Sequence, residues 1–544
     1  MFGTHDLKRA AQWGIPGAIL CLALGIQLYF AQRFGTGYDE AWNLFYAKIH
    51  PFLRSFIELR FNAHPPVASL FLRFPLFFGD TIFWARLGSV IPSIAAMGVL
   101  YLTFKRLCFT APLPIVVLWI VAVSHIYVNI SVCVRGYALM TLWLMAALYL
   151  YIDIVADLKN IAPKKAFLFV LFALLAVWTE YCAVFFIFAL FGSFVLLLVF
   201  GSISLSEGGK LFVRNWGAGL LLLLGGVGLL FYFKWTLMPL SQGHVTVYYL
   251  GAQESLLAYA VRGVSNNLRY FTVFDLQNPS WVIAAAMGMA CLSGGLIFYY
   301  SKSKPDPARA SILAAHMILW VVLFILGVRG LYPFGGAMRH QFVLYLFILL
   351  SFSIMADEVL RPISKPGLWF LCGFVIVTTL LLSNERFKGP PIEEFMPYPL
   401  FQTEYESFME KRTDAAPLYL TNYNHFGFFY HTIGWRWELK KSFDSLCFLY
   451  EVTKDGETIP IIVDRSQWRW PIPMDGRFEE RIAGILRFLN TETMWLFSVT
   501  QGKEFKQALE RGSLTSAPRN DKSAVRLEEA FVSGDGYGCR VRLN

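Results

Sequence analysis

The sequence predicts a polytopic membrane protein: an all-α bundle of about eleven transmembrane helices, followed by a small α/β domain outside the membrane. Of the 544 residues, 56% are hydrophobic and only 15% are charged, and the mean hydropathy is +0.51. A soluble protein of this length needs far fewer apolar residues. Long apolar runs recur up to residue 383, and the composition becomes ordinary after residue 384.

The apolar runs set the expected spans. They are about 16 to 20 residues long, which suits helices that cross about 30 Å of hydrocarbon. The first run is too long for a removed signal peptide and lacks a small-residue cleavage site, so we expect it to remain as a helix. The expected spans are residues 13–31, 86–104, 111–128, 135–151, 166–179, 181–200, 215–233, 280–300, 311–328, 341–356 and 367–383.

Lysine and arginine predict the orientation. With the N-terminus in the cytoplasm, the inner segments carry basic residues at roughly twice the density of the outer ones. We therefore expect the N-terminus inside and, because the number of spans is odd, the C-terminus outside. The net charge of +10 is then mainly a topology signal, which argues against nucleic acid as a partner. The inner basic residues are Lys8, Arg9, Lys105, Arg106, Lys159, Lys164, Lys165, Lys210, Arg214, Lys302, Lys304, Arg309, Arg361 and Lys365.

The change of composition predicts two domains: residues 1–384 in the membrane, and residues 385–544 in an extracytoplasmic α/β domain. In the second domain, APLYLTNY, IPIIVDR and MWLFSVT alternate as strands do, and RIAGILRFLN and GKEFKQALERG have helical patterns. Its two cysteines, Cys447 and Cys539, could form a disulfide in an oxidising exterior or remain free.

Loop lengths place the chemistry outside. Two outer loops are long: residues 32–85, expected to lie along or dip into the outer leaflet, and residues 234–279, expected to act as a mobile cover. The inner loops are too short for a nucleotide-binding fold. The sequence also lacks a Gly-rich phosphate loop, a zinc-spaced Cys/His set and a Gly-x-Ser-x-Gly elbow. An enzyme of this form would take its substrates from the membrane and the exterior.

Polar motifs recur at the outer ends of the spans. YDEAW places Asp39 and Glu40 just after the first span, NAHPP places His64 before the second, and VRGYALM, WTEYC and YPFGGAMRH follow. In this order the motifs resemble those of the GT-C glycosyltransferases, over most of residues 30–356. The resemblance is to the bacterial branch of protein-mannosyltransferase-like and aminoarabinose-transferase-like membrane enzymes. The chain departs from the pattern twice, with SVCV before Arg135 and with Glu180 in place of a histidine.

The resemblance implies transfer of a hexosyl or pentosyl group from a polyprenyl-phosphate-linked donor, with inversion, at the outer face of a bacterial inner membrane. The acceptor would be a lipid, a glycan or a protein. Asp39 is the implied general base and Glu40 supports it, and a semi-apolar interface raises the pKa of a carboxylate, making it a stronger base. The residues expected at the donor phosphate are His64, Arg135, Tyr137, Arg339 and His340, with Glu180 as a further candidate.

Each of these residues also has a plainer interpretation. The two loop acids could be solvated or cap a helix, and His64 could pack on Pro65. Arg135 and Tyr137 could be interfacial anchors. The arginine and histidine of the GGAMRH motif could reach the interface without binding a ligand, and Glu180 could be buried against the arginine at the start of the fourth span.

Three further alternatives stay open. Two carboxylates and a histidine in one loop would suit a divalent metal. A transporter or lipid flippase without transferase activity would also have many spans, although the spans carry few ionisable residues at mid-depth and no inverted repeat is evident. A non-catalytic assembly subunit is the third, and the Asp-Glu pair opposes it.

Overall fold

The structure, a computed structural model, forms two compact units. One contains residues 1–33, 61–68 and 86–394, and the other contains residues 34–60, 69–85 and 395–544. We call them the helical unit and the sheet unit. The described residues are 4–33, 38–49, 65–79, 81–158, 162–200, 215–235, 249–251, 254–271, 306–335, 338–387, 402–412, 414–421, 428–429, 432, 434–444, 446–466, 476–498, 502–511, 525–533 and 536–544.

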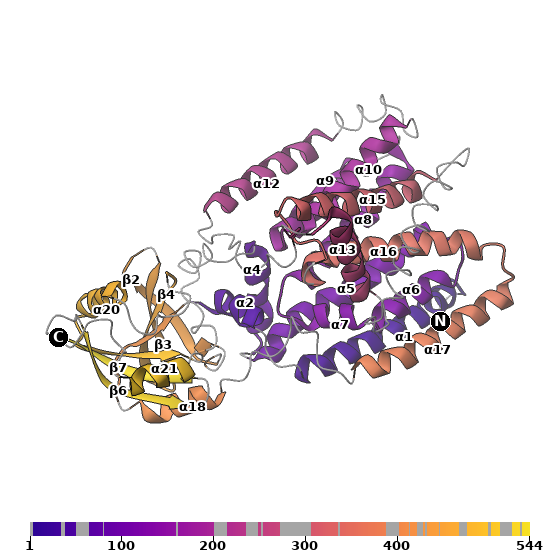
Figure 1. Cartoon of the computed structure of the whole chain (residues 1–544). Coiled ribbons are helices and arrows are strands. Elements are labelled where there is room, and N and C mark those ends of the chain that lie inside the picture. The colour runs from indigo at the N-terminus through magenta and orange to yellow at the C-terminus, as the bar shows by residue number, and fades with distance from the viewer. Residues whose placement is uncertain are drawn as a thin grey trace. The chain divides into compact units, whose positions relative to one another are not determined.

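Long apolar helices make up most of the helical unit (Figure 1). Among the described residues, five helices are long and apolar enough to cross a membrane, and a bent pair gives a sixth candidate. The helices are α1 (Thr4–Arg33), α5 (Ile82–Leu107), α6 (Leu113–Ala122), α7 (His125–Val132), α8 (Tyr137–Ala156), α9 (Pro163–Thr179), α10 (Ala183–Val199), α12 (Trp216–Trp235), α13 (Leu256–Phe271), α15 (Pro307–Val328), α16 (Met338–Leu360) and α17 (Lys365–Phe387). Helix α4 (Pro66–Leu76) begins in the helical unit, and its residues from 69 onward belong to the sheet unit.

Ten of the eleven expected spans fall on these helices, and the span expected at 280–300 lies outside the described residues. Four of the ten fall on helices whose apolar parts are shorter: Ala183–Val199, Trp216–Tyr232, Pro366–Thr379 and the 17-residue α9. The count of eleven therefore stays a prediction. A mostly helical membrane unit with a small C-terminal sheet is confirmed.

The span expected at 111–128 is two helices, α6 and α7, which meet at a 58° bend. Ser124 makes the break: its backbone is extended, and its hydroxyl accepts the N–H of Tyr127, as an N-cap residue does. The same hydroxyl accepts a hydrogen bond from Tyr345 of α16 at 3.1 Å. The bend is therefore fixed both by the capping bond within α7 and by the bond from the neighbouring helix α16. After the bend, α7 leads to the start of α8.

Hydroxyl groups tie the buried helices together. The phenol of Tyr151 on α8 lies 3.0 Å from the hydroxyl of Ser193 on α10 and within hydrogen-bond distance of Ser311 on α15. Ser193 and Ser311 are themselves 2.7 Å apart. All three side chains are buried. At the same end of α15, buried Arg309 pairs with buried Asp357 near the end of α16. These contacts fix α8, α10, α15 and α16 against one another.

The sheet unit is an α/β layer structure. Within the described residues, its sheet has seven strands in the order β2-β3-β4-β1-β5-β7-β6, in which β1 runs parallel to β4 and β5 and the remaining pairs are antiparallel. The elements are α2 (Tyr38–Lys48), α18 (Gln402–Lys411), β1 (Leu418–Thr421), β2 (Arg436–Ser442), β3 (Cys447–Lys454), β4 (Glu457–Asp464), α20 (Gly476–Leu489), β5 (Thr493–Ser498), α21 (Gly502–Glu510), β6 (Val525–Ser533) and β7 (Gly536–Leu543).

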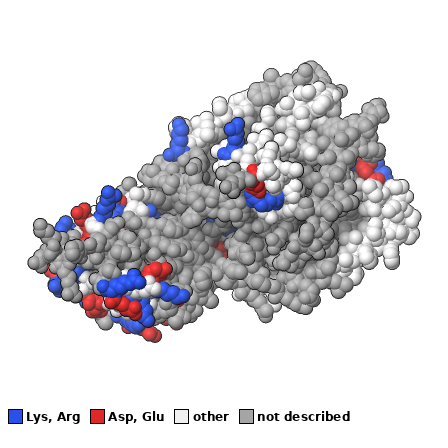
Figure 2. Space-filling model, viewed as in Figure 1, with Lys and Arg blue, Asp and Glu red and all other residues white. Residues whose placement is uncertain are grey.

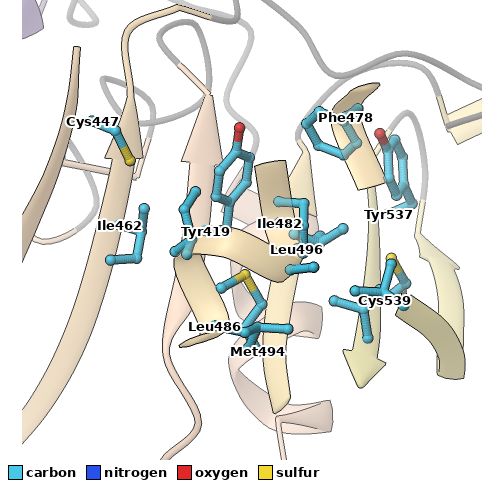
Figure 3. Packing of buried hydrophobic residues seen from close by; sticks show 14 of the residues in the cluster. Tyr419, Cys447, Ile462, Phe478, Ile482, Leu486, Met494, Leu496, Tyr537 and Cys539 are labelled. Atoms are coloured by element: carbon cyan, nitrogen blue, oxygen red, sulfur yellow. The ribbon is translucent and has the colours of Figure 1, made fainter. Parts of the chain in front are cut away.

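Both faces of this sheet are apolar. On one face, Tyr419, Ile462 and Leu496 pack against Ile482 and Leu486 of α20, within a larger cluster that includes Phe505 of α21 (Figure 3). The strands at APLYLTNY, IPIIVDR and MWLFSVT and the two helices were expected from the sequence and are confirmed. Because alternate residues of a strand point to opposite faces, Leu420, Ile461 and Trp495 lie on the other face.

Cys447 and Cys539 do not form a disulfide. Both are free, and they lie on β3 and β7, which are four strand positions apart in the sheet. At about 4.8 Å per position the separation is roughly 19 Å, whereas a disulfide needs Cα atoms within about 7 Å. Figure 3 shows them toward opposite sides of the cluster. This separation excludes the disulfide alternative. Both thiols are instead apolar core residues, and burial raises their pKa values.

The described surfaces of the two units differ in charge. In Figure 2, Lys, Arg, Asp and Glu side chains are frequent on the described surface of the sheet unit, whereas the described surface of the helical unit is mostly uncharged in this view. Large apolar residues such as Leu223, Phe231 and Phe370 are more than half exposed on the helices. Exposed apolar helix surface on this scale requires a lipid environment.

Candidate functional site

Three helices of the helical unit begin close to one another: α8 at Tyr137, α10 at Ala183 and α16 at Met338. Their links run from Gly136 to Glu180, from Cys182 to Met140 at 3.4 Å between sulfur atoms, and from Phe185 to Tyr332. Four sequence-predicted residues, Arg135, Tyr137, Glu180 and His340, have described side chains here. We call this region the helix-start site.

Arg135 sits in a tight turn between α7 and α8. Its N–H donates to the carbonyl of Cys133 at 2.7 Å, and the hydroxyl of Ser89 on α5 donates to the same carbonyl at 2.7 Å. The side chain is 6% exposed, and its guanidinium lies 5.9 Å from the ring centre of Tyr137. A buried arginine is strongly constrained in direction, and a simple surface anchor would be more exposed.

The uncharged segment before Arg135 also has a structural reason. Ser131 of this SVCV segment lies 2.6 Å from the hydroxyl of Ser93 on α5 and donates to the carbonyl of Tyr127. Val132, Cys133 and Val134 are buried. Acidic side chains would be buried here at a high cost. The departure from the family pattern therefore goes with close packing of α7 on α5.

Glu180 ends α9 and is 3% exposed. It packs directly against the backbone of the α8 entrance: a Cβ placed on Gly136 would lie 2.8 Å from both Cγ and Oε1 of Glu180. Gly136 is therefore required by close approach, since its φ of −66° suits any residue. Glu180 is thus buried against Gly136, which follows Arg135; its expected contact with Arg135 itself and its expected functional role stay predictions.

Tyr332 and Phe185 are site residues that the sequence interpretation missed. Their rings meet edge to face at 4.5 Å, and the Tyr332 hydroxyl donates to the carbonyl of His340 at 2.7 Å. The amide of Gln341 donates to the carbonyl of Pro333. The loop at residues 332–335 is thereby folded onto the first turn of α16 and onto α10. Its aromatic pair was a weak signal, because aromatic residues are common at the membrane interface.

Helix α13 covers this loop. The amide of Asn266 donates to the carbonyl of Gly335 at 3.1 Å, and a Cβ on Gly335 would lie 2.5 Å from the Cα of Gly263. Before the helix, Glu254 accepts two hydrogen bonds from Arg262, and these hold the pKa of Glu254 below its ordinary value. The long loop 234–279 thus contributes a helix packed on the start of α16, although its expected mobility is untested.

The arrangement is suited to an anion. The first turn of a helix carries a partial positive charge and presents N–H groups. In α10 the N–H groups of Ala183, Val184 and Phe185 already donate to the carbonyls of Glu180, Tyr181 and Cys182, so the helix starts that accompany Arg135 and His340 are those of α8 and α16. Arg339 lies in the first turn of α16; its side chain is outside the described part of the chain. Phosphate is the anion that helix starts and arginine most commonly bind together.

The predicted acids lie in the sheet unit. Asp39 and Glu40 are in the first turn of α2, where Glu40 is 4% exposed. The side chain of Asp39 and all of His64 fall outside the described residues. Within the described part of the chain, no group of three or more His, Cys, Asp or Glu side chains could hold a metal ion. The convergence of the acids with the helix-start site, and the metal, remain untested.

These features define an integral membrane protein with the GT-C-like fold that the motifs predicted. The solved structures include a similar one: ArnT from Cupriavidus metallidurans bound to undecaprenyl phosphate, with a TM-score of 0.50 and 11% identity, over 97% of this chain and 98% of that chain. No family model matches the chain. No curated protein sequence matches it either.

Proposed function

We propose that this protein is an inverting glycosyltransferase that moves a sugar from a polyprenyl-phosphate-linked donor to an acceptor hydroxyl at the extracytoplasmic face of a bacterial inner membrane. The observation that carries the proposal is the helix-start site, where buried Arg135 and Glu180 lie at the starts of α8 and α10, and Phe185 of α10 contacts the loop before α16. The similar fold of ArnT, whose structure is bound to undecaprenyl phosphate, supports a lipid-phosphate donor.

In this proposal the helix-start site holds the donor phosphate. Arg135, Arg339, His340 and His64 supply cations or N–H donors, and Tyr137 supplies a hydroxyl. Charge-assisted hydrogen bonds in a poorly solvated site are the strong ones. Their task is to bind the phosphodiester and to stabilise the phosphate monoester as negative charge grows on it. Glu180, beside Gly136, orients the arginine turn.

The chemical step needs one base. An acceptor hydroxyl oxygen attacks the anomeric carbon as the bond from that carbon to the phosphate oxygen breaks, and the hydroxyl proton passes to the carboxylate of Asp39. The products are the glycosylated acceptor with inverted configuration and polyprenyl phosphate. Because phosphate is a stable leaving group, it needs little protonation. Glu40 supports the loop, or holds a divalent metal if one is required.

The same proposal assigns the parts of the chain. Residues 1–384 form the transmembrane catalytic domain, with residue 1 in the cytoplasm, and residues 385–544 form the extracytoplasmic domain. The rival transporter or flippase would need ionisable groups at mid-span. His316, on α15, is buried and its ring nitrogen accepts the indole N–H of Trp320 at 2.8 Å, which is a structural role.

A panel of donors tests the function. Purified protein in detergent or nanodiscs would be incubated with undecaprenyl-phosphate-linked mannose, glucose and aminoarabinose, each with candidate lipid, glycan and peptide acceptors. We expect release of undecaprenyl phosphate with one donor, matched mole for mole by glycosylated acceptor. Tight binding of undecaprenyl phosphate without release from any donor, together with movement of the lipid across a bilayer, would favour the flippase instead.

A further inference from the structure

The sheet unit contains a short helix from the other end of the sequence. Helix α2, in the first outer loop, belongs to the same compact unit as strands β1 to β7. Phe45 of α2 makes edge-to-face ring contacts with Phe429 at 5.2 Å, Trp437 at 5.6 Å and Tyr450 at 5.7 Å. We call these four residues the aromatic anchor. Each is at most 1% exposed.

The aromatic anchor lies on the sheet face opposite α20 and α21. Tyr450 alternates along β3 with Cys447 and Leu449, which belong to the α20 cluster, so its side chain points to the other face. Trp437 is on the neighbouring strand β2, and its indole N–H donates to the hydroxyl of Thr432 at 3.2 Å. Phe408 of α18 covers the same face farther along, 4.4 Å from Phe497. Helix α2 is thus one of the elements that close this face.

A cation adds to the contact. Arg465, which directly follows the last residue of β4, is 9% exposed and holds its guanidinium 5.4 Å from the ring centre of Phe45. The backbone N–H of Arg465 donates to the carbonyl of Leu446 at 2.7 Å, and this bond fixes the position from which the side chain starts. A cation over an aromatic ring is worth most where water is excluded. Trp437 and Arg465 therefore both contact the ring of Phe45 on α2.

Most of the described side chains of helix α2 are buried. Besides Phe45, the side chains of Glu40, Ala41, Asn43, Leu44, Tyr46 and Ala47 are all buried. A helix of 11 residues is marginal by itself in water. Its position must therefore come from what it packs on, and the aromatic anchor is a fully buried contact of this kind.

We infer that the C-terminal sheet positions α2, and that Trp437 and Arg465 are positioning residues for the acids Asp39 and Glu40 in its first turn. The inference rests on the proposed function for what the acids do, and it gives the sheet unit a task. A rigid helix holds a catalytic group far more accurately than a loop does, and a misplacement of about 1 Å can lower a rate about 100-fold.

The test compares two substitutions on opposite faces of the sheet, one in strand β2 and one in helix α21. Trp437→Leu removes a ring from the aromatic anchor. Phe505→Leu removes a ring that is equally buried on the opposite face, where Phe505 stacks on Tyr537 at 4.1 Å. Arg465→Gln is a milder third variant, because it leaves the four rings of the aromatic anchor in place, and Arg465→Lys retains the charge and serves as its conservative rescue.

Amide hydrogen exchange of the full-length protein gives a readout independent of turnover. We expect residues 38–48 to exchange at least about 10-fold faster in Trp437→Leu and Arg465→Gln, and at the wild-type rate in Phe505→Leu. With the donor identified by the panel above, kcat should fall about 10-fold to 100-fold in the first two variants while the donor KM stays unchanged. Arg465→Lys should recover most of both.

Two results would overturn the inference: unchanged exchange of residues 38–48 in Trp437→Leu and Arg465→Gln, or equal losses of protection and kcat in Phe505→Leu. A wild-type protein that transfers no sugar would refute the proposed function, and the exchange comparison would still decide whether α2 is positioned by the sheet. The two failures are therefore distinguishable.

Discussion

At the residue scale, the proposed base is the most direct prediction. Asp39→Asn keeps the shape of the side chain and removes its ability to take a proton. Turnover should fall by about 10²- to 10⁴-fold, as is typical when a general base is lost, while donor binding stays near the wild-type value. Glu40→Gln should do less. Single-turnover transfer and lipid-phosphate binding measure the two effects separately; normal transfer by Asp39→Asn would move the base elsewhere, with Glu180 next to be tested.

The phosphate assignment makes a second prediction at this scale. Arg135→Ala and Arg339→Ala should each weaken binding of undecaprenyl phosphate by about 1.5–3 kcal/mol, the usual contribution of a hydrogen bond to a charged group. Arg329→Ala is the matched control, because it removes the same charge from an exposed position at the end of α15. Equal affinities for wild type and all three variants would disprove the assignment.

The position of several of these residues at span ends was predictable, because polar motifs follow one another in a recognisable order along the sequence. Arg135, Tyr137, Glu180 and His340 stood out as polar residues at span ends, and the structure places them at neighbouring helix starts. Phe185 and Tyr332 were missed, because an aromatic ring at a span end is equally consistent with contact to lipid. Only the fold brings those two rings together.

At the element scale, the contact between α13 and the loop before α16 predicts a difference between two glycines. Gly335 and Gly330 have φ values of +66° and +67°. An alanine at either position would cost about 1–2 kcal/mol for the left-handed conformation. Only at Gly335 would the new Cβ also meet the backbone of Gly263, whereas nothing lies within 4 Å of it at Gly330.

We therefore expect Gly335→Ala to lower the midpoint of thermal unfolding of the helical unit more than Gly330→Ala does, and to weaken donor binding. Proteolysis near α13 should increase in Gly335→Ala alone. Equal effects of the two substitutions on unfolding would mean that α13 does not depend on close approach of Gly263 and Gly335.

The elements themselves were predicted with uneven success, for a physical reason. Hydropathy located the apolar helices because each must satisfy its own backbone in lipid. It could not locate the break at Ser124, because one serine within an apolar run does not change the average, and its capping bond and its bond to Tyr345 form only in the fold. The strands of the sheet unit were readable from alternation, and their order was not.

At the scale of the whole molecule, the basic-residue bias predicts the topology. A reporter fused after Lys365 should score as cytoplasmic and one fused after Glu394 as extracytoplasmic, since α17 (Lys365–Phe387) is the last expected span. A fusion after Arg33, at the end of α1, provides a second outside point. The reverse pattern would place the helix-start site on the wrong side for a lipid-linked donor made available outside.

The division of the chain was only partly visible in the sequence. The composition change at residue 384 located the start of the tail, and the compact sheet unit begins at residue 395 but also includes residues 34–60 and 69–85. No local pattern could reveal this, because α2 reads as an ordinary short amphipathic segment. Its place depends on Phe45 meeting Phe429, Trp437 and Tyr450 from far along the chain.

The place of α2 also constrains how the protein is made. The ribosome completes Lys48 long before it reaches Leu418, and at the usual pace of synthesis the interval is roughly tens of seconds. During this interval Phe45 and its buried neighbours have no sheet to pack on. We therefore expect α2 to lie at the membrane surface or to be bound by a chaperone until the sheet is made. The tail, expressed as a separate polypeptide, would in turn expose Trp437 and Tyr450 and tend to aggregate unless a peptide of residues 38–48 is supplied with it.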